Sequence, residues 1–299
     1  MDGSAFRGTA PALVTPLSAD NQVDLDLVAE HAERCIAAGV EFLVPCGTTG
    51  ESATLTGAEQ KAVIGRVVEA AAGRVPVLAG AGSNSTAVAV ELARGAKEAG
   101  ADGVLVVTPY YNKPSPAGLE LHYRAIAEAG LPIVLYNVPG RTGANVVPSV
   151  VFSLAAAIPA LVGVKEAAGR MDQMMELVAG RPDGFSVLSG DDDLALAEMA
   201  IGANGLISVV ANEAPGQTAR MVRAGRDGQL EEGRKLLYSL LPLINANFAE
   251  TNPGPVKTAM ELLGYFPTHL RAPLAPIRPE TRTRLIAALL HAGLTPVST

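Results

Sequence analysis

Lys165 is the residue whose type and position most clearly suggest chemistry, and it is one of only six lysines in the chain. It ends the apolar run LVGVK, whereas the other lysines lie among charged residues in helical patterns or beside proline-rich stretches. Strands of a parallel sheet are buried on both faces. Burial disfavours an ammonium ion, and the neutral amine is a nucleophile toward a carbonyl group. Lys165 therefore favours Schiff-base chemistry, with an ion pair to Glu166 as the structural alternative.

Other polar side chains also follow runs that resemble strands. Tyr111 and Tyr136 follow two such runs, and a phenol can relay protons during imine formation, although packing is the simpler role. Thr48 and Thr49 stand between glycines, where hydroxyl and backbone N–H groups suit a small carboxylate; the alternative is an ordinary glycine-rich turn. Arg141 lies in PGRTG, and its guanidinium matches a carboxylate, although surface arginines are common.

Signatures of other chemistries are weak. The four histidines are scattered without metal-ligand spacing, and Gly80-Ala-Gly82 lacks the third glycine of a dinucleotide-binding motif. Cys46 has no histidine or base that can be placed beside it, so we expect a small buried apolar residue. The acidic run 191–193 is expected to cap the helix that follows rather than to bind a metal. We expect neither a metal nor an organic cofactor.

Composition narrows the class of protein. The chain has 299 residues, of which 48% are hydrophobic, so it can form its own core. Its net charge of −7, without clustered bases, argues against a nucleic-acid partner. Two cysteines and the absence of a signal-peptide pattern favour the cytoplasm. The uncharged stretch 142–164 is interrupted by glycine and proline, so we expect core elements there and no membrane span.

Alternating strand and helix patterns run through most of the chain. Short apolar runs, each followed by a helical pattern, indicate strands at 12–15, 42–45, 77–79, 104–108, 133–136, 161–165, 186–189 and 205–209. Helices are expected near 24–38, 56–72, 84–99, 116–129, 148–157, 170–179, 191–201 and 214–225, with further helices near 227–244, 254–264 and 279–292. Eight such units predict an α/β fold, a (β/α)₈ TIM barrel over 1–226, with a C-terminal helical appendix over 227–299 packed on it. In such a barrel the active site lies at the carboxyl ends of the strands.

Six motifs occur together in order: GTTGES, TPYYNKP, YNVPGRTG, GVKEAAG, SVVAN and ETNPGPVK. With them the sequence resembles the dihydrodipicolinate synthase and N-acetylneuraminate lyase family of class I, pyruvate-dependent aldolases. The resemblance covers nearly the whole chain, from about position 8 to about position 263. The arginine of YNVPGRTG is similar to that of the dihydrodipicolinate synthase branch.

The resemblance implies a role for each residue. Lys165 would form the Schiff base with pyruvate, and Tyr136 would donate and accept protons. Thr48 would link Tyr136 to Tyr111 in a relay. Other positions would bind the substrates: Thr49 and the backbone of Ile207 would hold pyruvate, and Arg141 would hold the carboxylate of L-aspartate 4-semialdehyde.

The resemblance also implies the reaction and the assembly. The enamine of pyruvate would attack the aldehyde of L-aspartate 4-semialdehyde, giving 4-hydroxy-tetrahydrodipicolinate for diaminopimelate and lysine biosynthesis. Two alternatives are a related aldolase acting on a sugar-derived 2-keto acid and a catalytically silent metabolite-binding homologue. Members of the family are usually homotetramers built from tight dimers, in which the tyrosine that matches Tyr111 reaches the neighbouring subunit's site.

Feedback by lysine is the last property on which the resemblance bears. In inhibited members an acid on the helix after GAGSN binds the ammonium of lysine, and histidines after GES often complete the pocket. Asn84 and Tyr110 match that pocket here, but Val88, Gly57 and Gln60 stand at the positions of the acid and the histidines. An ammonium buried beside valine lacks a partner, so we expect weak or absent inhibition.

Overall fold

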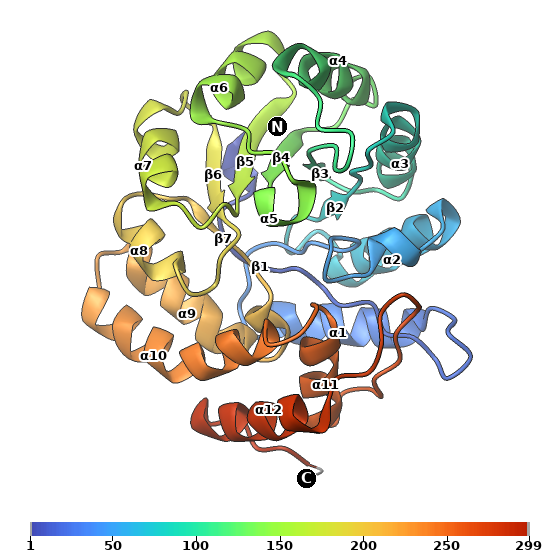
Figure 1. The fold of residues 1–299 in the computed structure, drawn as a ribbon, viewed down its shortest axis with the longest axis vertical. Helices are drawn as coiled ribbons and strands as arrows, with labels where there is room; N and C mark the ends of the chain where they lie inside the picture. Colours follow the sequence, from blue (N-terminus) through green and yellow to red (C-terminus); the bar gives the residue numbers. More distant parts are fainter. Residues whose placement is uncertain (1, 298–299) are drawn as a thin grey trace.

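A computed structural model describes residues 2–297, and a parallel sheet lies at its centre (Figure 1). Seven strands follow the order β1-β7-β6-β5-β4-β3-β2: β1 (Gly8–Pro11), β2 (Leu78–Gly80), β3 (Gly103–Val107), β4 (Ile133–Asn137), β5 (Leu161–Glu166), β6 (Ser186–Ser189) and β7 (Gly205–Ser208). The segment 42–45 lies between β1 and β2. The N–H of Leu13 donates to Val44, and that of Leu78 donates to Leu43, both at 2.9 Å. These bonds join the two edge strands, so the sheet curls into an α/β barrel-like fold.

Most predicted strands are present, with two differences near the N-terminus. The strand predicted at 12–15 lies four residues earlier, at Gly8–Pro11, because the apolar run ALVT belongs to the turn that leaves the barrel. In that turn the N–H of Val14 donates to the side chain of Asn212 rather than to a strand. The segment predicted as a strand at 42–45 forms only isolated parallel bridges to Ala12 and Val77.

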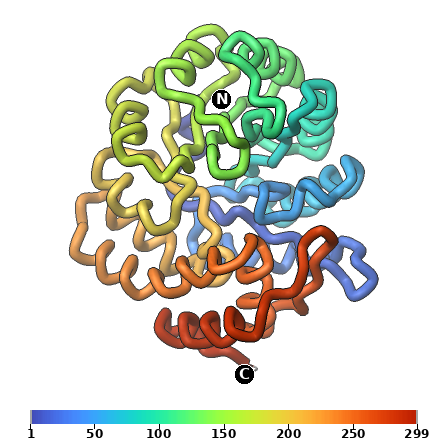
Figure 2. Tube along the Cα trace, in the orientation of Figure 1, coloured from blue at the N-terminus to red at the C-terminus, as the bar shows by residue number. Residues whose placement is uncertain are grey.

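Helices surround the strands, as the tube in Figure 2 shows. The α-helices are α1 (Leu25–Ala37), α2 (Gly57–Ala71), α3 (Thr86–Glu98), α4 (Pro116–Ala127), α5 (Pro139–Thr142), α6 (Pro148–Ala157), α7 (Met171–Gly180), α8 (Ala195–Ala200), α9 (Pro215–Arg226), α10 (Leu230–Asn247), α11 (Gly254–Leu262) and α12 (Pro279–His291). Three short 3₁₀ helices are η1 (Gly3–Ala5), η2 (Ser52–Thr54) and η3 (Val210–Asn212). A capping box starts α2, since Thr56 and Glu59 bond to each other's backbone N–H groups.

Alternation along each strand divides the core into two layers. In β4 the side chains of Val134 and Tyr136 lie inside the barrel, whereas Ile133 and Leu135 face the helices. Phe6 fills one end of the interior and is fully buried. A Cβ at Gly103 would lie 2.7 Å from the Phe6 ring, so only glycine fits beside it. The inward positions at the carboxyl ends of the strands are therefore left to form a site.

The last three α-helices pack on one another and against the barrel. Their shared core includes Leu240, Leu243, Leu262 and Leu285, all fully buried. α10 also packs against α8 and α9, and Figure 1 shows α10, α11 and α12 together at one side of the ring, at the bottom of the view. Within residues 2–297, no helix combines the length and the apolar character that crossing a membrane requires.

Candidate active site

Lys165 and Tyr136 are neighbours at the carboxyl ends of β5 and β4. The register of the two strands pairs them directly, so both side chains point into the barrel. The Nζ of Lys165 lies 4.3 Å from the centre of the Tyr136 ring. Lys165 is 6% exposed and Tyr136 is 8% exposed. The predicted nucleophile and the predicted proton donor thus lie in contact in a largely buried place.

Glu166 does not neutralise Lys165, although it follows it in sequence. Its carboxylate faces outward and accepts hydrogen bonds from Asn137 Nδ2, Gln173 Nε2 and the N–H of Ala168, at 2.8–3.1 Å. Within the part of the chain that the structure describes, Lys165 belongs to no ion pair. The structural alternative for Lys165, an ion pair with Glu166, is therefore wrong.

A cavity of about 100 Å³ lies over Lys165, and we call it the lysine cavity. It receives residues from the ends of several strands and from the segment after α10: Ala12, Val44, Gly47, Thr48, Thr49, Leu105, Tyr136, Val138, Arg141, Lys165, Ala167, Gly190, Asp191, Val209, Phe248 and Asn252. Gly190 lets the backbone approach the lysine, because a Cβ there would lie 2.9 Å from Lys165 Cε. The structure therefore brings together five predicted site residues: Lys165, Tyr136, Thr48, Thr49 and Arg141.

Thr48 and Thr49 present hydrogen-bond donors to this cavity. Among residues 2–297, their backbone N–H groups donate to no protein acceptor. The hydroxyl of Thr49 accepts a hydrogen bond from Asn252 Nδ2 at 3.0 Å, so its own proton is free to donate. Free N–H and O–H donors in one turn form a cradle for a carboxylate. Asn252 is a residue that the sequence did not single out, although it lies in the ETNPGPVK motif.

Arg141 lies on α5, a single turn of helix that follows β4. Pro139 starts the turn and Gly143 ends it with a φ of 72°, which favours glycine. Arg141 is exposed and lines both the lysine cavity and a larger groove of about 890 Å³. We call this the α2–α3 groove, because most of its lining comes from those helices. The position places a guanidinium at the mouth of the cavity.

The acidic run 191–193 does not act as predicted. α8 begins only at Ala195, and no side chain caps it. Asp192 is buried and accepts from the N–H groups of Val209 and Val210, both at 3.0 Å. Asp191 instead lines the lysine cavity. Burial raises the pKa of Asp191 to about 6, although the nearby charge of Lys165 acts to lower it.

Tyr111 and Ile207 lie outside the lysine cavity of their own chain. Tyr111 is 90% exposed and has a φ of 72°, a left-handed conformation that is unusual for a non-glycine residue. The side chain of Ile207 is buried inside the barrel, and Val209, two residues later, lines the cavity. Within residues 2–297, no group of histidine, cysteine and acidic residues could hold a metal ion. Burial raises the pKa of the Cys46 thiol to about 12, as expected for a buried apolar role.

Comparisons with known proteins match this fold and these motifs. The model of the dihydrodipicolinate synthetase family matches residues 5–292. The chain belongs to this family. A relative from Maridesulfovibrio salexigens, named 4-hydroxy-tetrahydrodipicolinate synthase, is 48% identical over 290 residues, covering 97% of this chain and 99% of the relative.

Solved structures of the family superpose closely on this chain. The dihydrodipicolinate synthase of Aquifex aeolicus is 41% identical, with a TM-score of 0.95 over 98% of this chain and all of that one. A chloride-inhibited enzyme from Acinetobacter baumannii, complexed with pyruvate, is also 41% identical, with a TM-score of 0.93 over 96% and 99% of the two chains. The barrel-like fold is thus that of the family.

Proposed function

We propose that the protein catalyses the class I aldol condensation of pyruvate with L-aspartate 4-semialdehyde, which gives 4-hydroxy-tetrahydrodipicolinate. The observation that carries the proposal is a buried lysine amine that forms no ion pair within residues 2–297, in contact with a tyrosine ring and facing a carboxylate cradle. Membership of the family supports the same reaction. The product would enter diaminopimelate and lysine biosynthesis.

The chemistry would begin at the amine of Lys165. It attacks the ketone carbon of pyruvate, and water leaves as the imine forms. Loss of a methyl proton then gives an enamine, whose carbon attacks the aldehyde of the second substrate. Tyr136 is the phenol nearest to Lys165 Nζ among the cavity residues, so it would move the protons in these steps. Ring closure onto the former ketone carbon by the substrate's amine would release Lys165.

The substrates would be held by charge and hydrogen bonding. The carboxylate of pyruvate would lie against the Thr49 hydroxyl and the free N–H groups of Thr48 and Thr49. The backbone near Ile207 would line the same pocket. Arg141, at the mouth of the cavity, would bind the carboxylate of L-aspartate 4-semialdehyde. Thr48 would connect Tyr136 to Tyr111 of a second subunit.

Borohydride trapping tests the proposal. Reduction in the presence of pyruvate should add one pyruvate-derived mass per chain, on the peptide that holds Lys165. Lys165→Ala should abolish the added mass. Trapping at Lys257, or none at all, would contradict the proposed imine. Initial rates with pyruvate and each of L-aspartate 4-semialdehyde, N-acetylmannosamine and glyceraldehyde then distinguish the proposed reaction from a sugar aldolase, and no turnover with any of them would indicate a silent homologue.

Family membership also supports finer proposals about architecture and assembly. We propose that 42–45 is the eighth strand of a (β/α)₈ barrel over 1–226, and that 227–299 is a helical appendix packed on it. The exposure of Tyr111 supports a homo-oligomer, a tetramer built from tight dimers, in which a neighbouring chain covers this loop. The proposed pathway favours a place in the cytoplasm.

A further inference from the structure

A second buried lysine, Lys257 on α11, follows Asn252 of the lysine cavity by five residues. Its Nζ donates to Glu51 Oε1 at 2.6 Å, to the carbonyl oxygen of Thr15 at 2.9 Å and to that of His269 at 2.6 Å. The side chains of Lys257 and Glu51 are 0% and 1% exposed. All three N–H bonds of the ammonium thus have acceptors, and the pair is held rigidly in the interior.

Glu51 belongs to the turn that carries the carboxylate cradle. Its N–H donates to the carbonyl oxygen of Thr48 at 3.1 Å, so Thr48 and Thr49 belong to the turn that this bond closes. The turn begins at Cys46 and ends at Glu51 with φ values of 56° and 57°. Both residues are non-glycine residues in the left-handed region, which the backbone adopts only when surrounding contacts enforce it.

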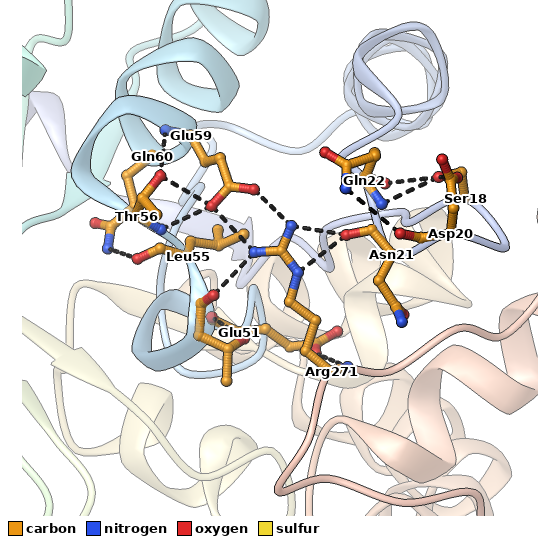
Figure 3. Close-up of polar contacts among 11 residues, drawn as sticks. Ser18, Asp20, Asn21, Gln22, Glu51, Leu55, Thr56, Glu59, Gln60 and Arg271 are labelled. Atoms are coloured by element: carbon orange, nitrogen blue, oxygen red, sulfur yellow. Dashed lines mark hydrogen bonds and ion pairs between the residues drawn. The ribbon is translucent and has the colours of Figure 1, made fainter.

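Arg271 supports the same carboxylate from the other side. Its backbone N–H donates to Glu51 Oε2 at 3.3 Å. Its guanidinium bonds Glu59 on α2, the carbonyl oxygen of Thr54 at 2.9 Å and that of Asn21 at 2.7 Å. Figure 3 shows the Arg271 side chain reaching to Glu59 and to the Asn21 carbonyl. Lys257 and Arg271 therefore hold the segment that follows the cradle at two points, Glu51 and Glu59.

A fully buried ion pair contributes little net stability compared with an apolar pair of the same shape, so stability alone does not account for this one. Its distinctive effect is directional, because the Lys257 ammonium and the backbone N–H of Arg271 set the position of the Glu51 carboxylate and hence of the backbone that precedes it. We propose that Glu51 and Lys257 are positioning residues for the keto-acid subsite, aiming the N–H and O–H donors of Thr48 and Thr49 at the carboxylate of the ketone bound on Lys165. This inference rests on the proposed function.

The test measures borohydride trapping against pyruvate concentration in Glu51→Gln and in the double variant Glu51→Gln/Lys257→Met. Lys257→Met alone is not used, because it would leave a buried carboxylate without a cation, whereas in Glu51→Gln the Lys257 ammonium keeps its two carbonyl acceptors. The pyruvate concentration for half-maximal trapping should rise at least tenfold in both variants. In each of them the Thr48 and Thr49 donors are no longer aligned with the carboxylate of pyruvate. The trapping rate at saturating pyruvate should change less than twofold, because Lys165 and Tyr136 are untouched. Lys235→Met, which removes an exposed lysine on α10, is the control and should match the parent protein.

Thermal melting of each variant distinguishes positioning from a merely structural role. The double variant leaves no unpaired buried charge, so its melting temperature should return toward that of the parent while its half-saturation for pyruvate stays raised. If the melting temperature and the half-saturating pyruvate concentration of the double variant both returned to the parent's values, the proposal would be overturned. A lower trapping rate at saturating pyruvate, with an unchanged half-saturating concentration, would overturn it as well. An absence of trapping in the parent protein would instead contradict the proposed function itself.

Discussion

Two buried lysines in this chain differ in what surrounds their amines. Lys257 donates to three oxygen atoms, one of them a carboxylate, and each bond favours the charged ammonium. Lys165 meets the face of the Tyr136 ring, a contact that stabilises a cation by about 0.5–2 kcal/mol. Attack by Lys257 on a carbonyl would break these three bonds, whereas the amine of Lys165 faces the lysine cavity, where a ketone can reach it. Burial alone, which both lysines share, would not have distinguished them.

Arg141→Ala tests whether Arg141 binds the carboxylate of L-aspartate 4-semialdehyde. We expect kcat/KM for L-aspartate 4-semialdehyde to fall by about 30- to 1,000-fold, equivalent to about 2–4 kcal/mol, because the substrate carboxylate loses a charged partner. Pyruvate trapping on Lys165 should be nearly unchanged. Arg170→Ala, which removes an exposed arginine paired with Asp172, is the control and should leave both unchanged. Equal losses in trapping and turnover would show that Arg141 does not serve the second substrate selectively.

Glu198 on α8 should make stability depend on pH. Burial and nearby acids raise its pKa from 4.5 to about 8, and its Oε2 has no hydrogen-bond partner within the described residues. Between these pH values the folded protein retains a proton that the unfolded chain has released, so the free energy of unfolding falls as pH rises. Glu198→Gln cannot ionise and should lose less stability than the parent between pH 5 and pH 8, by about 2–4 kcal/mol.

Urea unfolding at the two pH values measures this difference. Glu231→Gln, which alters an exposed glutamate on α10, is the control and should retain the pH dependence of the parent. Parallel curves for the Glu198→Gln variant and the parent would show that Glu198 ionises in the folded protein as it does in water.

At the scale of elements, local pattern predicted the helices well. α6 lies at the predicted residues, and α2 begins next to the predicted start at position 56, because caps and glycine stops act within a few residues. The first strand was misplaced because GTAP has little strand propensity of its own. It is a strand because β7 pairs with it, and Gly205 stands close against Gly8, where a Cβ would clash with the Gly8 carbonyl oxygen. Tertiary pairing there overrides local propensity.

The candidate site was predicted from residues at strand ends. The residues that the sequence did not single out, Asn252, Glu51 and Lys257, form contacts between distant parts of the chain. Lys165 and Tyr136 lie at the ends of predicted strands, and Thr48 and Arg141 follow such strands, so the barrel rule brings them together. Asn252 bonds Thr49 across 203 residues of sequence, and Glu51 meets Lys257 across 206. No local spacing encodes such pairs, because they depend on how the C-terminal helices dock.

The α2–α3 groove bears on feedback by lysine. Gly57, Gln60, Val88 and Tyr110 line it, whereas Asn84, the other residue that matches the family's lysine pocket, is not among its lining residues. Val88 is 43% exposed. Lysine inhibition should be weak or absent, because valine cannot pair with the ammonium. Val88→Glu should introduce or strengthen inhibition in a lysine titration of the initial rate. Half-inhibition of the parent protein at sub-millimolar lysine would contradict this expectation.

At the scale of the whole molecule, one chain leaves its proposed relay incomplete. Lys165, Tyr136 and Thr48 surround the lysine cavity, but Tyr111 projects into solvent from a loop in a left-handed conformation. Tyr110 lines the α2–α3 groove, which shares Thr48 and Arg141 with the cavity. A large exposed aromatic in a constrained loop, beside a groove that opens on the active site, suits an interface with a second copy.

Mixing two inactive variants tests whether Tyr111 acts across that interface. Tyr111→Phe and Lys165→Ala chains each lack one proposed catalytic group, and a hybrid dimer would contain one site with both groups intact. Mixed and reassembled chains should therefore recover at most about a quarter of the parent activity per chain, because about half of random dimers are hybrids and each has one complete site. Hybrid formation is verified by native mass spectrometry. The double variant Tyr111→Phe/Lys165→Ala mixed with Lys165→Ala is the control and should recover nothing. Hybrids without activity would place Tyr111 outside the neighbouring site.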